Sequence, residues 1–455
     1  MKKGFNFKKA KPSIFNLHTL RDSVLTFVLR LAQTLGIIIE MVTNNKILLR
    51  FLVLFVVLLT VPFPLNTFPK LEFISESILK FYQKIITWLG ENIFNLERSF
   101  SINQTGSGDK TFDYLLLLFL LIITVFGTIV WSIADKKNRN YENLNYWFLV
   151  LVRYYLGYFM IYYGLFKIIP IQFGEINFWK MLQPYGESSP MGLAWTFLGH
   201  SKGYSLFIGL SEFIGGIFLF HKRTKLLGAL ILIPVIVNIV AINFFFDVPV
   251  KIFSSLLLLM AIIVIAPDFK RLLNLIIFNK PTYTVNFASP FETKKWVLWT
   301  NIVKWLFVLS ILYNTIDLTI GIHKTRKNKP ELFGLYEVTT FVSNEDTIQP
   351  LLTDDKRWRY IFIEYPNTIQ FSRMDKSRYG LNSEIDTLKK QIKLTEFKDS
   401  TQVYLLNFKK TDSTLNISGI FRQDTIFCKT KRLDLKDFRL TSRGFNWINE
   451  HPYNR

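Results

Sequence analysis

The sequence predicts a mainly α-helical membrane bundle of about seven transmembrane helices, followed by an antiparallel β-barrel domain. Three observations support this fold class. The 455-residue chain is 50% hydrophobic, and its apolar residues gather into stretches close to the length that crosses a bilayer. The Lys and Arg residues, which give a net charge of +21, flank these stretches. From about residue 328 the hydrophobic pattern changes to the two-residue alternation of strands.

The apolar stretches and the basic clusters between them predict the membrane topology. The predicted spans are residues 47–65, 114–133, 147–169, 204–220, 226–246, 248–266 and 296–316. Because positive loops favour the cytoplasmic side, we expect the N-terminus inside and the chain after residue 316 outside. This bias explains the charge better than nucleic-acid binding, for which no motif is present. The amphipathic segment 23–42 favours an interfacial helix, with an eighth span as the alternative.

Eight short segments after residue 328 predict a small antiparallel barrel. They are residues 335–342, 358–364, 368–373, 379–385, 391–395, 402–408, 414–421 and 425–431. Five parts follow along the chain. They are a basic N-terminus with the amphipathic segment (1–46), two spans with a long outward loop (47–146), a four-helix core (147–275), a loop with the last span (276–327) and the β domain (328–455).

The outward loop between the first two spans contains two predicted features. Residues 71–96 predict a helix whose apolar face packs on the outer surface of the bundle; this face is formed by Phe73, Ile74, Ile78, Phe81, Ile85 and Trp88. The sequence Gly106-Ser107-Gly108-Asp109 predicts a tight turn that caps the next helix at Asp109 or Thr111, rather than a phosphate-binding loop.

Polar side chains within or beside the core spans are the candidate ligand-binding residues, because each charge in a bilayer costs about 2.5 to 3.5 kcal/mol on insertion scales. Glu212 is expected near mid-membrane, where Lys167 is its candidate partner. Structural roles are the alternatives: an ion pair at a helix start, an interhelical amide, or an arginine that reaches lipid phosphates. The candidates are Arg153, Lys167, Glu212, Asn238, Asn243, Asp247 and Lys251.

The sequence gives little support to metal or redox chemistry within the chain. Cys428 is the single cysteine, so an intramolecular disulfide and a dithiol pair are excluded. The histidines are not at metal-ligand or haem-ligand spacing in the bundle, and no nucleotide fingerprint is present. We therefore expect no metal and no intrinsic cofactor.

Residues 147–266 contain Tyr163-Gly164-Leu165-Phe166-Lys167, Gln172-Phe173, Ser189-Pro190-Met191-Gly192 and Asp247-Val248-Pro249-Val250-Lys251. With this pattern the segment resembles the DoxX-like family of small membrane bundles, most closely its larger variant with flanking domains. The resemblance implies a four-helix transmembrane core. In the β domain, Gly334-Leu335-Tyr336 is similar to the first-strand signature of lipocalins.

These observations predict a binding or accessory protein for a lipid-like or quinone-like molecule, at the outer side of a bacterial inner membrane and below a periplasmic barrel. One alternative is a membrane subunit of a quinone-linked oxidoreductase, which the names of similar bundles imply and which requires a redox partner protein. A second alternative is a proton-coupled transporter that uses Glu212. Whether the chain is an enzyme stays open. Membrane lipids are expected partners, and nucleic acid is not.

Overall fold

The computed structural model describes residues 45–96, 106–135, 140–283, 290–291, 293–397, 399 and 401–454. The chain forms two compact units. We call Met1–Leu165 with Ile208–Thr315 the helical unit, and Phe166–Phe207 with Ile316–Arg455 the barrel unit. The predicted amphipathic segment 23–42 lies outside the described residues.

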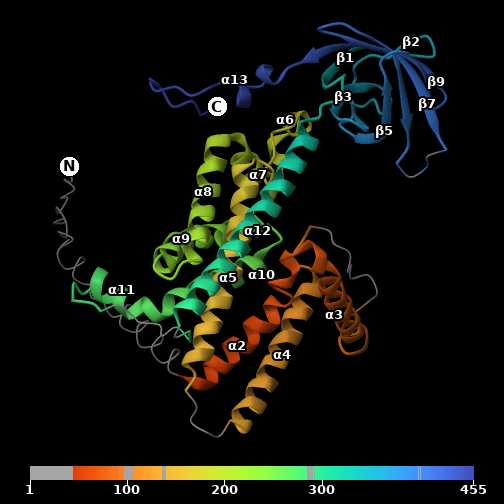
Figure 1. Cartoon of the computed structure of the whole chain (residues 1–455). Helices are drawn as coiled ribbons and strands as arrows, with labels where there is room; N and C mark the ends of the chain where they lie inside the picture. The colour runs from red at the N-terminus through yellow and green to blue at the C-terminus, as the bar shows by residue number, and fades with distance from the viewer. Residues whose placement is uncertain are drawn as a thin grey trace, which may run out of the picture. The chain divides into compact units, whose positions relative to one another are not determined.

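Long apolar helices form most of the helical unit (Figure 1). Across the described chain, six helices are long and apolar enough to cross a membrane: α2 continued to Thr67, α4, α5, α9, α10 continued through α11, and α12. The chain is therefore a multi-pass membrane protein. The bounds are α2 (Lys46–Thr60), α3 (Glu72–Asn92), α4 (Thr111–Ala134), α5 (Glu142–Ile168), α8 (Lys202–Leu219), α9 (Lys225–Phe245), α10 (Lys251–Ile265), α11 (Phe269–Ile276) and α12 (Lys294–Lys327).

The predicted fourth span, residues 204–220, forms α8 but is not among these six helices. Its 18 residues include Ser211, Glu212 and several glycines, which shorten its apolar stretches. The seven apolar segments of the sequence thus correspond to six helices that qualify as spans by length and composition, plus α8.

Glycine contacts hold α8 between α5 and α9 in the helical unit. A methyl group on Gly164 of α5 would lie 2.8 Å from the backbone nitrogen of Phe213 in α8. A methyl group on Gly215 of α8 would lie 2.6 Å from the side chain of Leu232 in α9. Distances below about 3 Å leave no space for a side chain, so the helices pack this closely because glycine occupies these positions.

Helix α3 forms at the predicted place and packs against α4, but only part of its predicted apolar face is covered: Ile74, Ile78 and Ile85 are half-buried. Ile86 is fully buried, whereas Phe73, Phe81 and Trp88 are 64%, 59% and 56% exposed. The contact with α4 therefore covers part of the apolar surface of α3 and leaves these three side chains outside it.

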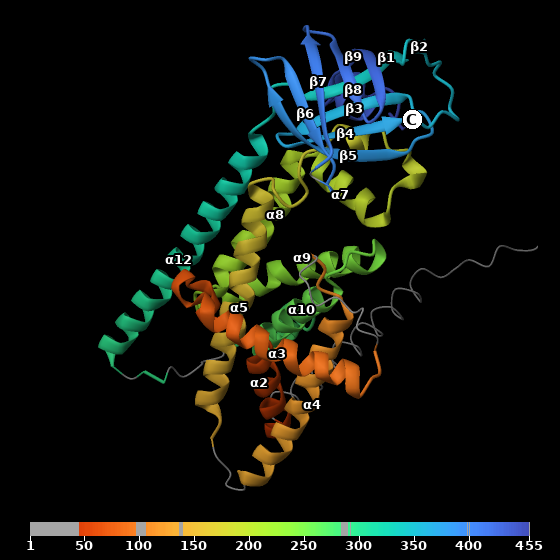
Figure 2. The ribbon, with the colours of Figure 1, turned by 90° about the vertical axis from the view of Figure 1, so that its right-hand side faces the viewer.

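The barrel unit contains a closed antiparallel barrel (Figure 2). Each strand pairs with the next, and β1 also pairs with β9, which closes the sheet. Strand β2 pairs only with the end of β1, so eight of the nine strands form the barrel. All eight predicted strands are confirmed. Their bounds are β1 (Gly334–Ser343), β2 (Asp346–Thr347), β3 (Trp358–Tyr365), β4 (Thr368–Arg373), β5 (Arg378–Asp386), β6 (Gln391–Thr395), β7 (Val403–Lys410), β8 (Leu415–Phe421) and β9 (Asp424–Leu433).

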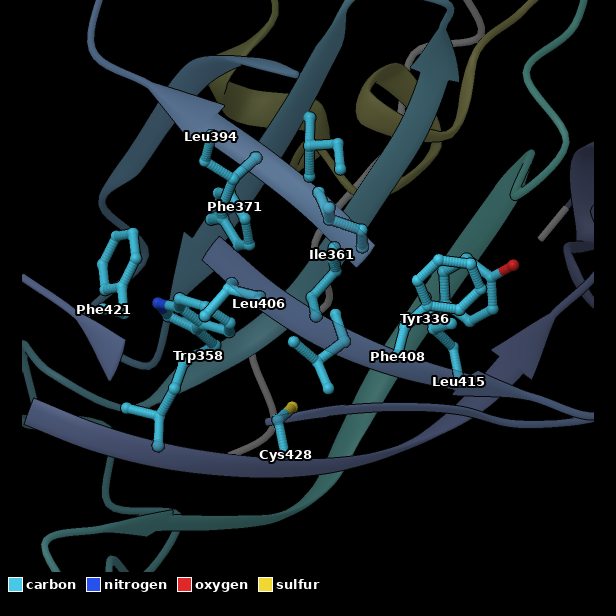
Figure 3. Close-up of a cluster of buried hydrophobic side chains, with 14 of the residues drawn as sticks. Tyr336, Trp358, Ile361, Phe371, Leu394, Leu406, Phe408, Leu415, Phe421 and Cys428 are labelled. Atoms are coloured by element: carbon cyan, nitrogen blue, oxygen red, sulfur yellow. The ribbon is translucent and has the colours of Figure 1, made fainter. Parts of the chain in front are cut away.

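Large side chains fill the interior of this barrel (Figure 3). The rings of Trp358 and Phe371 lie 4.5 Å apart between their centroids, and Phe421 packs on Trp358 at 5.2 Å. Cys428 is fully buried in the same cluster. The barrel therefore has a packed core, as small barrels do when inward-facing residues are bulky.

A short helix from outside the sheet covers part of the barrel surface within the barrel unit. Helix α6 (Phe178–Met181) buries Phe178 against Leu335 and Phe362. The backbone N–H of Phe178 donates to Glu364 Oε1 at 2.6 Å, and Arg378 donates to the carbonyl of Trp179 at 3.2 Å. These contacts explain why the connection between α5 and α8, including α7 (Pro190–His200), belongs to the barrel unit. The last helix is α13 (Arg439–Ser442).

Candidate functional site

The contact between α5 and α8 brings a buried carboxylate near a tyrosine. Glu212 of α8 is 1% exposed and directly precedes Phe213, whose backbone approaches Gly164 of α5. Tyr163 directly precedes Gly164 and lies within range of an electrostatic interaction with Glu212. A carboxyl group held away from water must be protonated or compensated by nearby polar groups. This pair is the centre of the candidate site.

Aromatic rings surround Tyr163 in the helical unit. Phe253 of α10 lies 6.2 Å from Tyr163 and 4.8 Å from Phe159, measured between ring centroids. Nearer the start of α5, the ring of Tyr155 packs edge-on against that of Phe63, with 5.2 Å between their centroids. Helices α5, α8 and α10 therefore meet around a surface that combines aromatic faces with a carboxyl and a phenol group. Such a mixture of apolar and convergent polar groups is typical of small-molecule sites.

A second polar group of residues lies where α9 turns into α10; we call it the junction cluster, formed by Asp109, Asn243, Asp247, Lys251 and Ser254. Asp109 comes from the loop before α4, and its carboxylate accepts the backbone N–H groups of Lys251 at 2.7 Å and Ile252 at 3.0 Å. These are the first two residues of α10, so Asp109 caps this helix from a distant part of the sequence. The prediction that this turn caps the following helix was therefore wrong for Asp109, and an interaction between Lys110 and Asp113 caps α4 instead.

The other members of the junction cluster join α9 to α10. Asn243 is 4% exposed and its amide donates to Ser254 Oγ at 3.0 Å. Lys251 Nζ lies 2.9 Å from Asp247 and 3.8 Å from Asp109. Asp247 is itself in the left-handed region, with φ of 50°, and its side chain is 84% exposed. The structural alternative expected for Asp247 and Lys251, an ion pair at a helix start, describes the contact that these two residues make. The interhelical hydrogen bond that was expected of Asn238 is made by Asn243 instead.

The remaining predicted site residues lie apart from Glu212 or in the other unit. Asn238 is on an exposed face of α9, so the structure does not place it with Asn243. Arg153 lies three turns before Tyr163 on α5, beside Tyr154. Lys167 belongs to the barrel unit, whereas Glu212 belongs to the helical unit, so their pairing stays a prediction.

Within the barrel unit, Lys167 is 6% exposed and lines a cavity of about 10 Å³. Glu175 and Lys202, which form an ion pair of 2.7 Å, line the same cavity. The hydrogen bond from Lys202 lowers the pKa of Glu175, with smaller effects from nearby positive charges. A volume of this size holds about one water molecule, so it cannot contain a quinone ring.

Reasoning from the sequence missed Tyr163 and Ser254 as members of these polar groups. Tyr163 stands within a run of aromatic residues whose periodicity does not show which ring faces a carboxylate. Ser254 is a common residue in an apolar helix, and only its distance to Asn243 identifies its role. The short separation in sequence between Asn243 and Ser254, across a helical hairpin, is the one signal that could have paired them.

Cysteine and metal chemistry have no candidate in the described residues. Burial raises the pKa of the Cys428 thiol to about 12, so the reactive thiolate form is suppressed. In the residues that the structure describes, no group of three or more His, Cys, Asp and Glu side chains could hold a metal ion.

Comparison with known proteins identifies a relative in Bacillus subtilis (strain 168), named "Uncharacterized protein YwoB". The two sequences are 37% identical over 126 residues, which is 27% of this chain and 78% of the relative. The chain belongs to the YwoB family. Membership in the YwoB family carries no assigned activity with it, because the relative's name states none. No family model matches the chain. No solved structure matches it either.

Proposed function

We propose that the chain is a DoxX-like membrane protein that binds a lipid-like or quinone-like molecule and acts as a binding or accessory protein. The ligand lies in the helical unit, between Glu212 of α8, Tyr163 of α5 and Phe253 of α10. A redox partner protein is required only if the bound molecule is reduced or oxidised in a complex.

The burial of Glu212 carries this proposal. At 1% exposure its carboxyl group is removed from water, which is unfavourable by several kcal/mol unless other groups compensate. Tyr163, which has a hydroxyl group, interacts electrostatically with Glu212, and the ring of Phe253 lies beside Tyr163 and Phe159. Aromatic faces favour a flat or acyl ligand, and the carboxyl and hydroxyl groups provide hydrogen bonds to its polar atoms.

The bias of positive charge supports an outer location for the junction cluster. Lys222, Arg223 and Lys225 stand at the turn between α8 and α9, and basic turns favour the cytoplasmic side. The opposite end of α9, which carries Asn243 and Asp247, then faces the outside of a bacterial inner membrane. The barrel domain is periplasmic in this orientation.

The test compares the parent protein with Glu212→Gln and, as a matched control, Glu76→Gln. Both changes remove one carboxylate from the helical unit, but Glu76 is exposed on α3 in an ion pair with Lys80. Each protein is purified in detergent, extracted with organic solvent, and its extract is quantified by absorbance and mass spectrometry. Glu212→Gln should retain about tenfold less quinone or lipid, since a hydrogen bond to a charged group contributes about 1.5 to 3 kcal/mol.

Three results of this experiment are decisive. Loss of the molecule in Glu212→Gln alone supports the proposal. Equal retention in all three proteins refutes a site at Glu212. A flavin or haem in the parent extract favours the alternative of a quinone-linked oxidoreductase subunit, since it identifies a redox group that the described residues do not predict.

A further inference from the structure

Basic side chains from three segments of the helical unit gather at the turn between α8 and α9. We call this the basic cluster; it consists of Arg153, His221, Lys222, Arg223 and Lys304. Burial lowers the pKa of His221, and the positive charges of Lys304, Arg223, Lys222 and Arg153 lower it further. The charges of Arg153 and Lys222 also act on Lys304. Ring contacts of Tyr154 in α5 with Phe220, which precedes His221, and with Phe307 in α12 bring these three segments together.

Among the residues that the structure describes, no acidic group compensates the charge of this cluster. Within the described ranges, none of its Lys and Arg side chains forms an ion pair, and the buried Nε atom of Arg153 has no hydrogen-bond partner. The carboxylate of Asp268 lies in the same unit, but it is paired with Lys225 at 3.4 Å and with Arg271 at 3.6 Å. A buried guanidinium donor without an acceptor is unfavourable, so an anion would supply the acceptor that the described residues do not provide.

An aromatic surface, formed by the rings of Tyr154, Phe220 and Phe307, lies next to these charges. Tyr154 packs against Phe220 at 5.0 Å and is stacked on Phe307 at 6.2 Å, and Phe220 approaches Phe307 at 6.4 Å. The guanidinium of Arg153 lies 5.9 Å from the ring of Tyr154. Cations above an aromatic surface at the end of membrane helices match a group that is charged at one end and apolar at the other.

The α8–α9 turn is held in a defined shape. The hydroxyl of Thr224 donates to the carbonyl of Phe218 at 2.8 Å, and the backbone N–H of Arg223 donates to His221 Nδ1 at 3.2 Å. The latter contact keeps Nδ1 as an acceptor, consistent with the lowered pKa of His221. Lys222 and Arg223 are exposed, whereas Arg153 and Lys304 are half-buried, so the cluster offers both an accessible and a sheltered side.

We propose that the basic cluster binds the phosphate group of an anionic phospholipid. Arg153 and Lys304 contact the phosphate from the half-buried side of the cluster, and Lys222 and Arg223 contact it from the exposed side. The acyl chains lie along the aromatic surface. The turn lies where α8 ends and α9 begins, which is the level at which lipid headgroups meet membrane helices. This site does not use Glu212 and does not depend on the function proposed above.

The experiment measures lipid binding to the delipidated full-length protein in detergent by native mass spectrometry. Phosphatidylglycerol is the anionic probe, phosphatidylcholine is the zwitterionic control lipid, and inorganic phosphate tests a free anion. The variants are Lys304→Gln, and the exposed double change Lys222→Gln with Arg223→Gln, which leaves the buried packing intact. Lys84→Gln is the matched control, because Lys84 is an exposed lysine of α3 in the same unit.

The parent should bind phosphatidylglycerol in preference to phosphatidylcholine. Lys304→Gln and the double variant should each weaken this binding about tenfold, whereas Lys84→Gln should leave it unchanged. Equal binding of the anionic lipid by the parent and both cluster variants refutes the proposal. Competition by inorganic phosphate at the same concentration as the lipid also refutes it, since the site would then recognise a free anion.

Discussion

Removal of the Asp109 carboxylate should destabilise the helical unit although this residue lies far in sequence from the helix that it caps. In Asp109→Ala, the N–H groups of Lys251 and Ile252 lose their acceptor, and water replaces it poorly because the Asp109 side chain is 7% exposed. Loss of a cap costs about 0.5 to 2 kcal/mol. Loss of a negative charge at a helix N-terminus costs about 0.3 to 1 kcal/mol more. The expected decrease in unfolding free energy is thus about 1 to 3 kcal/mol.

The purified variants are unfolded in detergent, and circular dichroism monitors the loss of helix. Asp109→Asn keeps one side-chain oxygen and should cost less than Asp109→Ala. Asp247→Asn is the matched control, because it removes the other carboxylate partner of Lys251 from an exposed position, and asparagine tolerates the left-handed backbone there. Its effect should stay within about 0.5 kcal/mol. An equal loss in Asp109→Ala and Asp247→Asn, or no loss in Asp109→Ala, would contradict the capping role.

Three further predictions concern other parts of the chain. Gly164→Ala should lower the thermal midpoint in detergent because its methyl group meets the α8 backbone. Gly321→Ala in α12 should not lower it, because a methyl group there meets nothing within 4 Å. Equal midpoints of the two variants would refute the close helix contact. Cys428 should resist thiol reagents at pH 8 until the protein is denatured, and rapid labelling of the folded protein would show that it is not buried. Burial raises the pKa of Glu364, so the folded state binds the carboxyl proton more tightly than the unfolded state does. The barrel unit should therefore lose stability as pH rises through that pKa. A Glu364→Gln variant whose stability has the same pH profile as the parent would contradict this prediction.

The strands were predictable because their signal is local. Inward-facing residues of the barrel alternate with outward-facing ones, as in β7, where buried Tyr404, Leu406 and Phe408 alternate with exposed neighbours. Turn-forming residues separate the strands, so the sequence also gives their number. The closing pair of β1 and β9 follows from the same reasoning, because a sheet of eight short strands is most stable without free edges.

Contacts between distant segments were less accessible to sequence reasoning. The apolar pattern of α3 does not reveal how much of its apolar face the contact with α4 covers, and so Phe81 was expected to pack on the bundle although it is exposed. Asp109 was expected to cap the helix that follows it, since caps are usually local. The polar character of Asn238 and Asn243 is the same, yet one is exposed and the other joins α9 to α10. Such differences depend on the rotation of each helix about its axis, which a few residues decide.

The glycine contact between α5 and α8 connects the packing of the bundle with the candidate site. Gly164 approaches the backbone of Phe213, and the two residues that directly precede them in sequence are Tyr163 and Glu212. The distance between the two helices at this point therefore sets the separation of the carboxyl and phenol groups. A methyl group at residue 164 must push the helices apart, since the nearest atoms belong to the rigid backbone of α8. If the ligand is held by both polar groups, Gly164→Ala should reduce its retention even at temperatures where the variant remains folded, and full retention would separate the binding site from this helix contact.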